Sequence, residues 1–347
     1  LANIGDDELG WESSTQTNIG ISMQMFDGKL RLDVDAYEKL TEDLLLPYPV
    51  SVVSGLTQVT TNLGEIENKG IEAKLGLTLV ESDDFTWDTE FTYAYNTNEV
   101  LSIGDNAEGI NIPGFGTTSI YIGKPIGIST LPIWVGVDPA SGQDMYRTLD
   151  GRDLTVAEGV AEYGSVNNFL NSNQVAYGNP HPDFIGSFSS RLTYKNWSVS
   201  TLWNFAVGQN YIASGEQIQG KFAYGSMDIT PLRSQLGRWR NPGDVVRVAQ
   251  VTTAPTIWGR TTEYAADIDY LRMRDLTIAY RFDLENDSFL KGVDLYAKFT
   301  NFLTFTNAPP SMYDPENYIR GGNLNLMDKW KQVPQAKTVN LGINIKL

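Results

Sequence analysis

Hydrophobic and polar residues alternate strictly over the last segment of the chain, 336–347. Val339, Leu341, Ile343 and Ile345 point to one side, and the polar residues between them point to the other. This period of two predicts a β-strand with one apolar and one polar face. A soluble protein seldom leaves such a strand as a bare edge, because its unpaired N–H and C=O groups invite aggregation. A membrane barrel has no bare edge, and its apolar face lies outside.

The same alternation recurs along the chain and predicts nine antiparallel strands. After the first of them, Asp27-Gly28 is a two-residue hairpin signal. No amphipathic helix of useful length is predicted. The predicted strands are 18–25, 30–37, 71–79, 85–95, 184–194, 197–207, 270–282, 293–302 and 336–347.

Short and long connections between these strands also alternate. The turns near residues 27, 82 and 195 are short, and the one near 287 is slightly longer. Short turns on one side and long loops on the other are typical of an outer-membrane barrel, whereas a soluble sandwich or propeller predicts more even spacing. The long connections are 40–68, 98–183, 208–267 and 304–335, and the second contains two weak strand candidates, 119–122 and 133–137, which makes nine to eleven strands.

The length of one strand fits a membrane. Phe85 and Tyr95 share a face, and at about 3.3 Å per residue they lie roughly 33 Å apart. With a tilt of about 40°, the strand covers roughly 25 Å of membrane, the height of the apolar band of a barrel. Aromatic residues therefore lie near both rims. The alternative is that they pack in a soluble β-core.

Composition excludes several classes of protein. The mean hydropathy is −0.25 and no long apolar run occurs, so no transmembrane helix is predicted. Cysteine is absent, which excludes disulfides and thiolate metal sites. The net charge of −16 argues against a nucleic-acid partner. Calcium binding by loop carboxylates stays open for Asp138, Asp144, Asp150 and Asp153, although their spacing matches no known calcium loop.

Catalytic residues are scarce, so we predict that the protein is not an enzyme. One histidine and no cysteine leave few nucleophile–base pairs. His181 stands between two prolines, where a turn residue is expected. Asp33 and Asp35 share the polar face of a strand, where they are expected to line a solvated channel. An outer-membrane enzyme is the rival hypothesis, but such enzymes are usually complete small barrels.

The strands at the two ends of the chain need partners. The chain opens at Leu1 without a signal peptide, which an exported protein requires. Single-chain barrels of bacteria have an even number of strands. We therefore expect further strands upstream or on another chain, beside the strands 18–25 and 336–347. Residues 1–14 are expected to belong to an extracellular loop.

Ordered motifs give the chain a resemblance to a known family. They resemble those of SusC/RagA-type TonB-dependent transporters of the Bacteroidetes outer membrane. Two departures stand out: the family usually ends on Phe rather than Leu347, and its acidic D-x-N-G-D-G segment is reduced around 150–153. The matching segments are Gly10–Gly20 (W-E-T-T-x-Q-x-N-I-G), Asn62–Glu72 (N-x-G-x-I-x-N-K-G-x-E), Gly178–Phe184 (G-N-P-x-P), Tyr270–Tyr280 (Y-L-R-L-R-N-I-T-L-G-Y), Asn301–Thr306 and Tyr313–Glu316.

The resemblance implies a transmembrane antiparallel barrel of about 22 strands around a plug, with residues 1–347 as its C-terminal portion. It implies four partners: outer-membrane lipid, a SusD-like surface lipoprotein, TonB through the N-terminal region, and the remaining strands and plug. The implied function is active import of an oligosaccharide or peptide too large for porins. The alternative is a structural barrel subunit of a larger outer-membrane assembly, without transport. No resident cofactor is expected.

Loop aromatics are the candidate contacts to a solute or partner, because their rings stack on sugars and pack against peptide side chains. Packing within the loops is the alternative role. The candidates are Trp134, Tyr146, Trp239, Trp258, Tyr313 and Trp330.

Two arginines conflict with the apolar pattern of one strand. Arg272 and Arg274 have the same parity as Leu276, which is expected to face lipid. A charge at the bilayer midplane costs about 2–4 kcal/mol. Either both arginines lie at the rim, where their side chains reach water, or the strand bulges between them and Leu276. The rim position is the expected solution.

Overall fold

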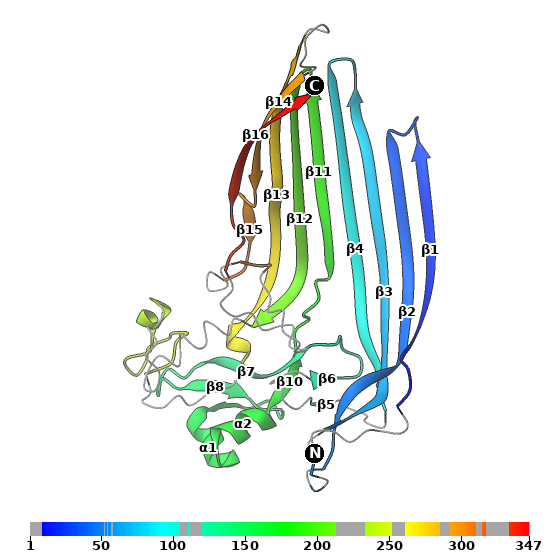
Figure 1. Cartoon of the computed structure of the whole chain (residues 1–347). Helices are drawn as coiled ribbons and strands as arrows, with labels where there is room; N and C mark the ends of the chain where they lie inside the picture. Colours follow the sequence, from blue (N-terminus) through cyan, green and yellow to red (C-terminus); the bar gives the residue numbers. More distant parts are fainter. Residues whose placement is uncertain are drawn as a thin grey trace.

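The chain folds mainly into one antiparallel sheet (Figure 1). The computed structural model describes residues 9–51, 53, 55–56, 58–104, 110–111, 119–212, 233–251, 261–284, 292–309, 314–316 and 333–346. The strands of the sheet, in spatial order, are β1 (Ser13–Met25), β2 (Leu30–Pro49), β3 (Gln58–Glu81), β4 (Phe85–Ile103), β11 (Phe184–Tyr194), β12 (Trp197–Ile212), β13 (Ala265–Asp283), β14 (Gly292–Thr300) and β16 (Thr338–Lys346). A short strand, β15 (Thr304–Thr306), also pairs with β13. The nine predicted strands are therefore confirmed, in the predicted antiparallel order.

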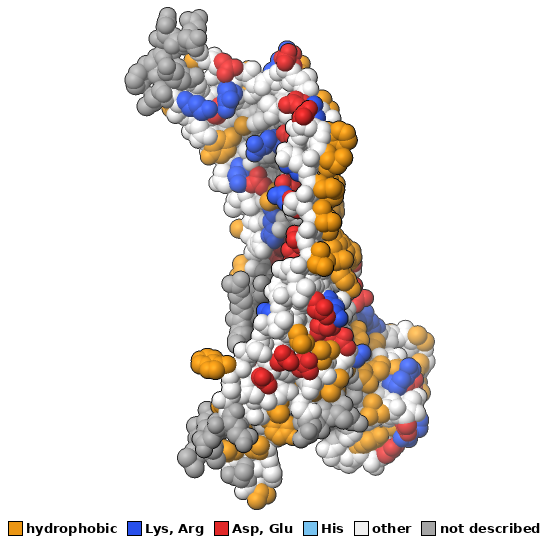
Figure 2. Space-filling view, turned by 90° about the vertical axis from the view of Figure 1, so that its right-hand side faces the viewer, with side chains coloured by type: hydrophobic (Ala, Val, Ile, Leu, Met, Phe, Trp, Pro, Cys, Tyr) orange, Lys and Arg blue, Asp and Glu red, His pale blue; other side chains and the backbone are white. Residues whose placement is uncertain are grey.

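The pairing register collects the apolar side chains on one side of the sheet. Ile19 pairs with Ala36, Ala36 with Ile71, and Ile71 with Tyr95. Because directly paired residues point to the same side, the apolar face continues from β1 to β16. Figure 2 looks onto the β1 side and shows hydrophobic side chains along one side of the sheet, with charged residues beside them. Ile19 is 72% exposed, so the apolar face is bare of protein.

Short turns and long loops lie at opposite ends of the sheet, as predicted (Figure 1). The first hairpin differs from the expected two-residue turn. Residues 26–29 form a longer turn, in which Phe26, Asp27 and Gly28 all have positive φ angles. The N–H of Gly28 donates to the carbonyl of Met25 at 3.2 Å. Gly28, with φ of 86°, has no Cβ to oppose this conformation.

Strands β2 and β3 extend far beyond the predicted segments. Much of the predicted connection 40–68 is paired strand, which corrects that expectation. At about 3.3 Å per residue, the 24 residues of β3 span roughly 80 Å, far more than a membrane needs. The extensions have their own core at the loop end, formed by Leu46, Ile66, Val100, Ile103 and Ile120.

The long connection after β4 folds into a small unit, here called the loop subdomain (residues 129–177). Its sheet has the order β10-β7-β8-β9, formed by β7 (Ser129–Val137), β8 (Asp144–Arg147), β9 (Asp153–Thr155) and β10 (Gln174–Tyr177). Two helices, α1 (Val156–Tyr163) and α2 (Val166–Ser172), pack beside it.

These elements correct two expectations. The absence of helices was wrong, since Thr155 caps α1 in a capping box with Glu158. The candidate at 133–137 is a strand of the loop subdomain, and the candidate at 119–122 becomes β6 (Ser119–Ile120), paired with β5 (Ile110–Asn111). Neither joins the main sheet. Among the described residues, no helix is long and apolar enough to cross a membrane.

Candidate functional site

The polar face of the sheet carries a charged cavity of about 620 Å³. Asp33, Asp35 and Glu72 line it from neighbouring strands, together with Lys74 and Asn204. The ammonium of Lys74 lies 3.1 Å from the carboxylate of Glu90, and both side chains are exposed. These residues lie on the face opposite the apolar band, as the sequence predicts for a water-filled channel wall.

A β-bulge in β13 resolves the conflict between the arginines and the apolar pattern. Leu202 pairs with Asp275, whereas the next residue, Trp203, pairs with Met273. Arg274 is therefore an extra residue, and the parity of β13 changes there. Arg272 then lies on the polar face, and Leu276 stays on the apolar face. The expected rim position is wrong for Arg272, which is only 3% exposed.

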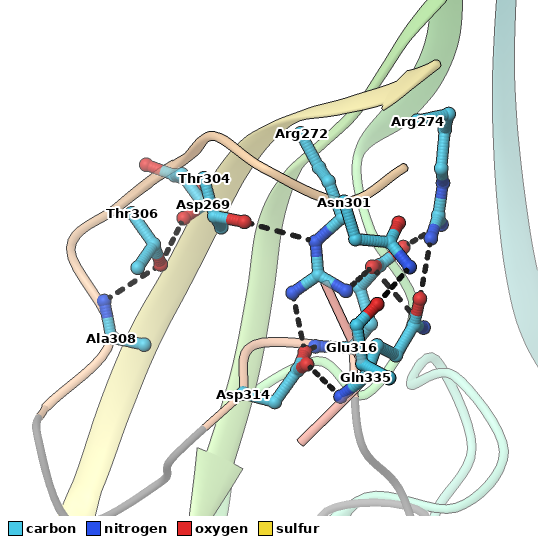
Figure 3. Close-up of polar contacts among 11 residues, drawn as sticks. Asp269, Arg272, Arg274, Asn301, Thr304, Thr306, Ala308, Asp314, Glu316 and Gln335 are labelled. Atoms are coloured by element: carbon cyan, nitrogen blue, oxygen red, sulfur yellow. Dashed lines mark hydrogen bonds and ion pairs between the residues drawn. The ribbon is translucent and has the colours of Figure 1, made fainter. Parts of the chain in front are cut away.

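Arg272 and Arg274 bind two carboxylates from the loop that follows β15, residues 307–337 (Figure 3). The Arg272 Nη2 atom lies 2.6 Å from Asp314 Oδ1, and its Nε donates to Thr304 Oγ1 at 3.1 Å. Glu316 forms ion pairs with both arginines. Asp314 and Glu316 have side chains only 4% and 8% exposed. We call these four residues the arginine–carboxylate cluster; it attaches the loop to the polar face of β13.

Backbone groups complete the cluster. Asp314 Oδ1 accepts from the N–H of Glu316 at 2.9 Å, and its Oδ2 accepts from the N–H of Gln335 at 3.0 Å. Burial raises the pKa of the Asp314 carboxyl, but hydrogen bonds from Arg272 and from these amides outweigh it and hold the pKa below its usual range. Sequence reasoning missed this partnership. Its signal was a pair of arginines on one strand and a pair of acids in a later loop.

Tyr146 lies in the core of the loop subdomain. Its side chain is fully buried, and its ring meets the edge of Phe169, with ring centroids 6.3 Å apart. Val156 and Leu170 complete this core. The position fits packing, the alternative role that the sequence left open for the loop aromatics.

Trp134 and Trp239 contact the same turn, residues 138–144, and both are half-buried. Trp134 Nε1 donates to Asp144 Oδ1 at 2.8 Å, and Trp239 Nε1 donates to the carbonyl of Pro139 at 2.9 Å. The ring of Trp239 covers Gly142, where a Cβ atom would lie only 2.4 Å from the ring. The structure thus brings two candidates to one turn. Three further candidates, Trp258, Tyr313 and Trp330, lie outside the described residues.

The four candidate calcium ligands belong to separate hydrogen-bond networks. Asp138 binds Ser141 and the N–H of Ala140, and these hydrogen bonds lower its pKa. Asp144 binds Trp134, Asp150 binds Arg152, and Asp153 binds Arg147. Within the described ranges, no group of three or more acidic or histidine side chains is arranged to hold a metal ion.

His181 is held in the turn before β11. Its N–H donates to Asn179 Oδ1 at 3.0 Å, and its Nε2 lies 3.1 Å from the carbonyl oxygen of Ile126. Burial lowers the pKa of the imidazole, although the hydrogen bond with Ile126 opposes this shift. The contacts are those of a turn residue, the role that the sequence predicted.

Comparison with known proteins identifies the family of this two-faced sheet. The sequence model of the family described as "TonB dependent receptor-like, beta-barrel" matches residues 1–231. The chain belongs to this family. The expected resemblance is thereby confirmed, and so is a location in the bacterial outer membrane. The TonB-dependent receptor family comprises receptors and transporters rather than a class of enzymes.

Relatives and solved structures agree with this membership. TonB-dependent receptor P39 of Formosa agariphila is 27% identical over 380 residues, covering 99% of this chain and 36% of the relative. TonB-dependent receptor SusC of Bacteroides thetaiotaomicron is 24% identical over 203 residues, covering 56% of this chain and 19% of SusC. A structure titled "Structure of the RagAB peptide transporter" matches the fold with a TM-score of 0.82 at 22% identity, covering 99% of this chain and 36% of that chain.

The chain spans about a third of the length of these receptors. In it, the β-barrel wall and the loop subdomain account for the described residues. What the remaining length of a TonB-dependent receptor contributes, and what the whole protein transports, are therefore matters for the proposal below.

Proposed function

We propose that this chain forms part of the wall of an outer-membrane importer of oligosaccharides or peptides, the SusC-like barrel of a SusC/SusD-type complex. One observation carries the proposal: a sheet with a continuous apolar face and a charged opposite face, joined to a folded loop subdomain at one end. The apolar face suits lipid, and the polar face suits a lumen through which hydrated solutes pass. The names of SusC and of the RagAB peptide transporter support both solute classes.

The implied partners follow the same reasoning. A SusD-like surface lipoprotein would cover the end of the sheet that carries the loop subdomain. TonB would supply energy through a plug. We propose that the plug and the other barrel strands belong to the rest of the protein, because the chain covers only 36% of its relatives' length. No resident cofactor is part of the proposal.

Trp134 and Trp239 are the described aromatics best placed to contact a solute or the lipoprotein. Both rings are half-buried rather than enclosed, and both lie on the turn 138–144 of the loop subdomain. Replacement of Trp239 by Phe would retain the contact with Gly142, whereas replacement by Ala would remove the ring. We expect solute binding to fall only with Ala if the ring makes the contact. Equal binding by both variants would assign Trp239 to packing.

Deletion of the gene in the native bacterium tests the function. We expect the mutant to lose growth on one class of oligosaccharide or peptide as sole nutrient, while growth on monosaccharides and free amino acids is unchanged. Restoration by the intact gene, but not by one lacking the TonB-interacting segment, would establish energised import. Unchanged growth on every nutrient, combined with a weakened outer membrane, would instead favour the structural subunit.

A further inference from the structure

The apolar face contains a groove near the short-turn end of β12, β13, β14 and β16. It encloses about 760 Å³, within the range of about 300–1,000 Å³ that is usual for small-molecule sites. Its floor is Ala297, which pairs with Ile278 on one side and Leu341 on the other. Because alanine is the smallest residue in this row, the surface is hollow there. Leu295 and Ile343 form the next row.

Aromatic rings form one wall of this groove. Trp197 meets Tyr280 with ring centroids 4.8 Å apart, and Tyr280 meets Phe282 at 4.7 Å, both in edge-to-face geometry. The opposite wall is aliphatic, and Leu341 and Ile343 are 79% and 63% exposed. In an outer-membrane protein this surface faces lipid rather than water. Interlocked rings present a shaped wall to one acyl chain instead of a smooth surface.

A lysine stands at the rim beside the aromatic wall. Lys195 lies in the turn between Tyr194 and Trp197, and its Nζ is 5.6 Å from the centroid of the Tyr194 ring. Tyr194 and Trp197 pair directly and so share the apolar face. Asp84 is the acidic group nearest to Lys195, at 3.8 Å, beyond direct hydrogen-bonding distance. The Lys195 side chain is 54% exposed, so its ammonium can meet a phosphate.

We propose that this groove binds one phospholipid of the periplasmic leaflet as a specific ligand of the barrel. One acyl chain lies over Ala297 between the aromatic and aliphatic walls, and the phosphate meets Lys195. Short turns of outer-membrane barrels face the periplasm, which assigns the leaflet. The site is independent of solute import.

Lipid binding can be measured by native mass spectrometry of the protein that carries this chain, purified from its native membrane and stripped of lipid. We expect wild type to retain one phosphatidylglycerol. Ala297→Trp fills the groove and is expected to weaken binding about tenfold, since it removes contact with roughly two methylenes. Ala73→Trp is the matched control, because Ala73 is half-buried on the same face of β3, outside the groove. It should bind like wild type.

The headgroup contact has its own test. Lys195→Gln should reduce the preference for phosphatidylglycerol over diacylglycerol with the same acyl chains by about fivefold. Equal phosphatidylglycerol binding by wild type and Ala297→Trp would overturn the proposal. So would a wild-type dimer that Ala297→Trp dissociates, because the groove would then be covered by a second copy of the chain.

Discussion

Single residues on the polar face carry charge in two different settings. Lys74 and Glu90 form an exposed pair, which water screens and which contributes about 0–1 kcal/mol. Arg272 is buried with Asp314 and Glu316, so its charge depends on these partners alone. The sequence placed both cations on strands, but it did not distinguish the two settings.

Loss of the Arg272 charge is expected to destabilise the protein strongly. Arg272→Met leaves Asp314 and Glu316 buried without their main cation, which costs about 3–5 kcal/mol. The measurement is the free energy of urea-induced unfolding in lipid vesicles. The matched control is Lys74→Met, which removes the exposed pair and should cost under about 1 kcal/mol. Equal losses for both variants would contradict a buried role for Arg272.

Protonation of Asp314 is expected to release the loop at low pH. The pKa of Asp314 is lower in the attached loop than in a free one, where it is about 3.9. The attachment is therefore fully stable above that value and is lost as the pH falls through the lower, attached pKa. Hydrogen exchange of the Gln335 amide, corrected for its intrinsic pH dependence, reports the release. Asp314→Asn should abolish the pH-dependent step.

Gly70 of the Asn62–Glu72 motif is required for close approach of neighbouring strands. A Cβ atom there would lie 2.5 Å from the Tyr37 ring and 2.6 Å from the backbone oxygen of Tyr95. We expect Gly70→Ala to destabilise the barrel by about 1–3 kcal/mol, because the backbone oxygen cannot move aside. At Gly76 the nearest atoms belong to the flexible Arg31 side chain, so Gly76→Ala should cost less in the same unfolding measurement.

At the scale of elements, the loop subdomain is a small folded unit with its own core. Tyr146, Phe169 and Leu170 are almost fully buried in it. Gly159 of α1 contacts the Phe169 ring so closely that a Cβ atom would lie 2.2 Å from it. These contacts are separate from the strand pairing of the main sheet, so the two parts are expected to lose structure independently.

Phe169→Ala tests this independence. Removal of the ring is expected to cost the loop subdomain about 3–5 kcal/mol, while the barrel strands stay folded. Limited proteolysis should then cleave within residues 129–177, and the heat-modifiable migration of the barrel should not change. Leu149→Ala, at a side chain 66% exposed, is the control and should resist cleavage like wild type. Loss of the folded barrel together with the loop subdomain would disprove the separation.

At the scale of the whole molecule, the two faces of the sheet set its orientation between lipid and lumen. Phe188 and Ser187 are neighbours in β11 but point to opposite faces. Phe188 contacts Phe91 on the apolar face, with ring centroids 4.7 Å apart. Ser187 hydrogen-bonds to Thr92 on the polar face at 2.6 Å.

An arginine at either position separates the faces. Phe188→Arg places a charge in lipid near the middle of β11, at a cost of about 2–4 kcal/mol, and should reduce the fraction of folded barrel in the outer membrane. Ser187→Arg points the same charge into the lumen and should leave that fraction close to wild type. Heat-modifiable migration measures the folded fraction. Equal assembly of both variants would contradict the assignment of the faces.

The strands and their two faces could be predicted from the sequence because both are local. In a strand, successive side chains alternate by geometry alone, so Ile19 to Met25 and Leu30 to Ala36 already show which face is apolar. Membrane lipid accepts only one such face, which makes the pattern a statement about environment as well as structure. The register that aligns these faces across the sheet followed from the same requirement.

Tertiary structure alone decided the bulge at Arg274, the strand extensions of β2 and β3, and the arginine–carboxylate cluster. Arg272 and Asp314 are 42 residues apart, and no local pattern marks them as partners. Burial of Tyr146 likewise depends on Phe169 from a helix that the strand-rich pattern concealed. A charge or an aromatic ring has the same local signature in water, in lipid or in a core. Only the residues that fold against it determine which of these surrounds it.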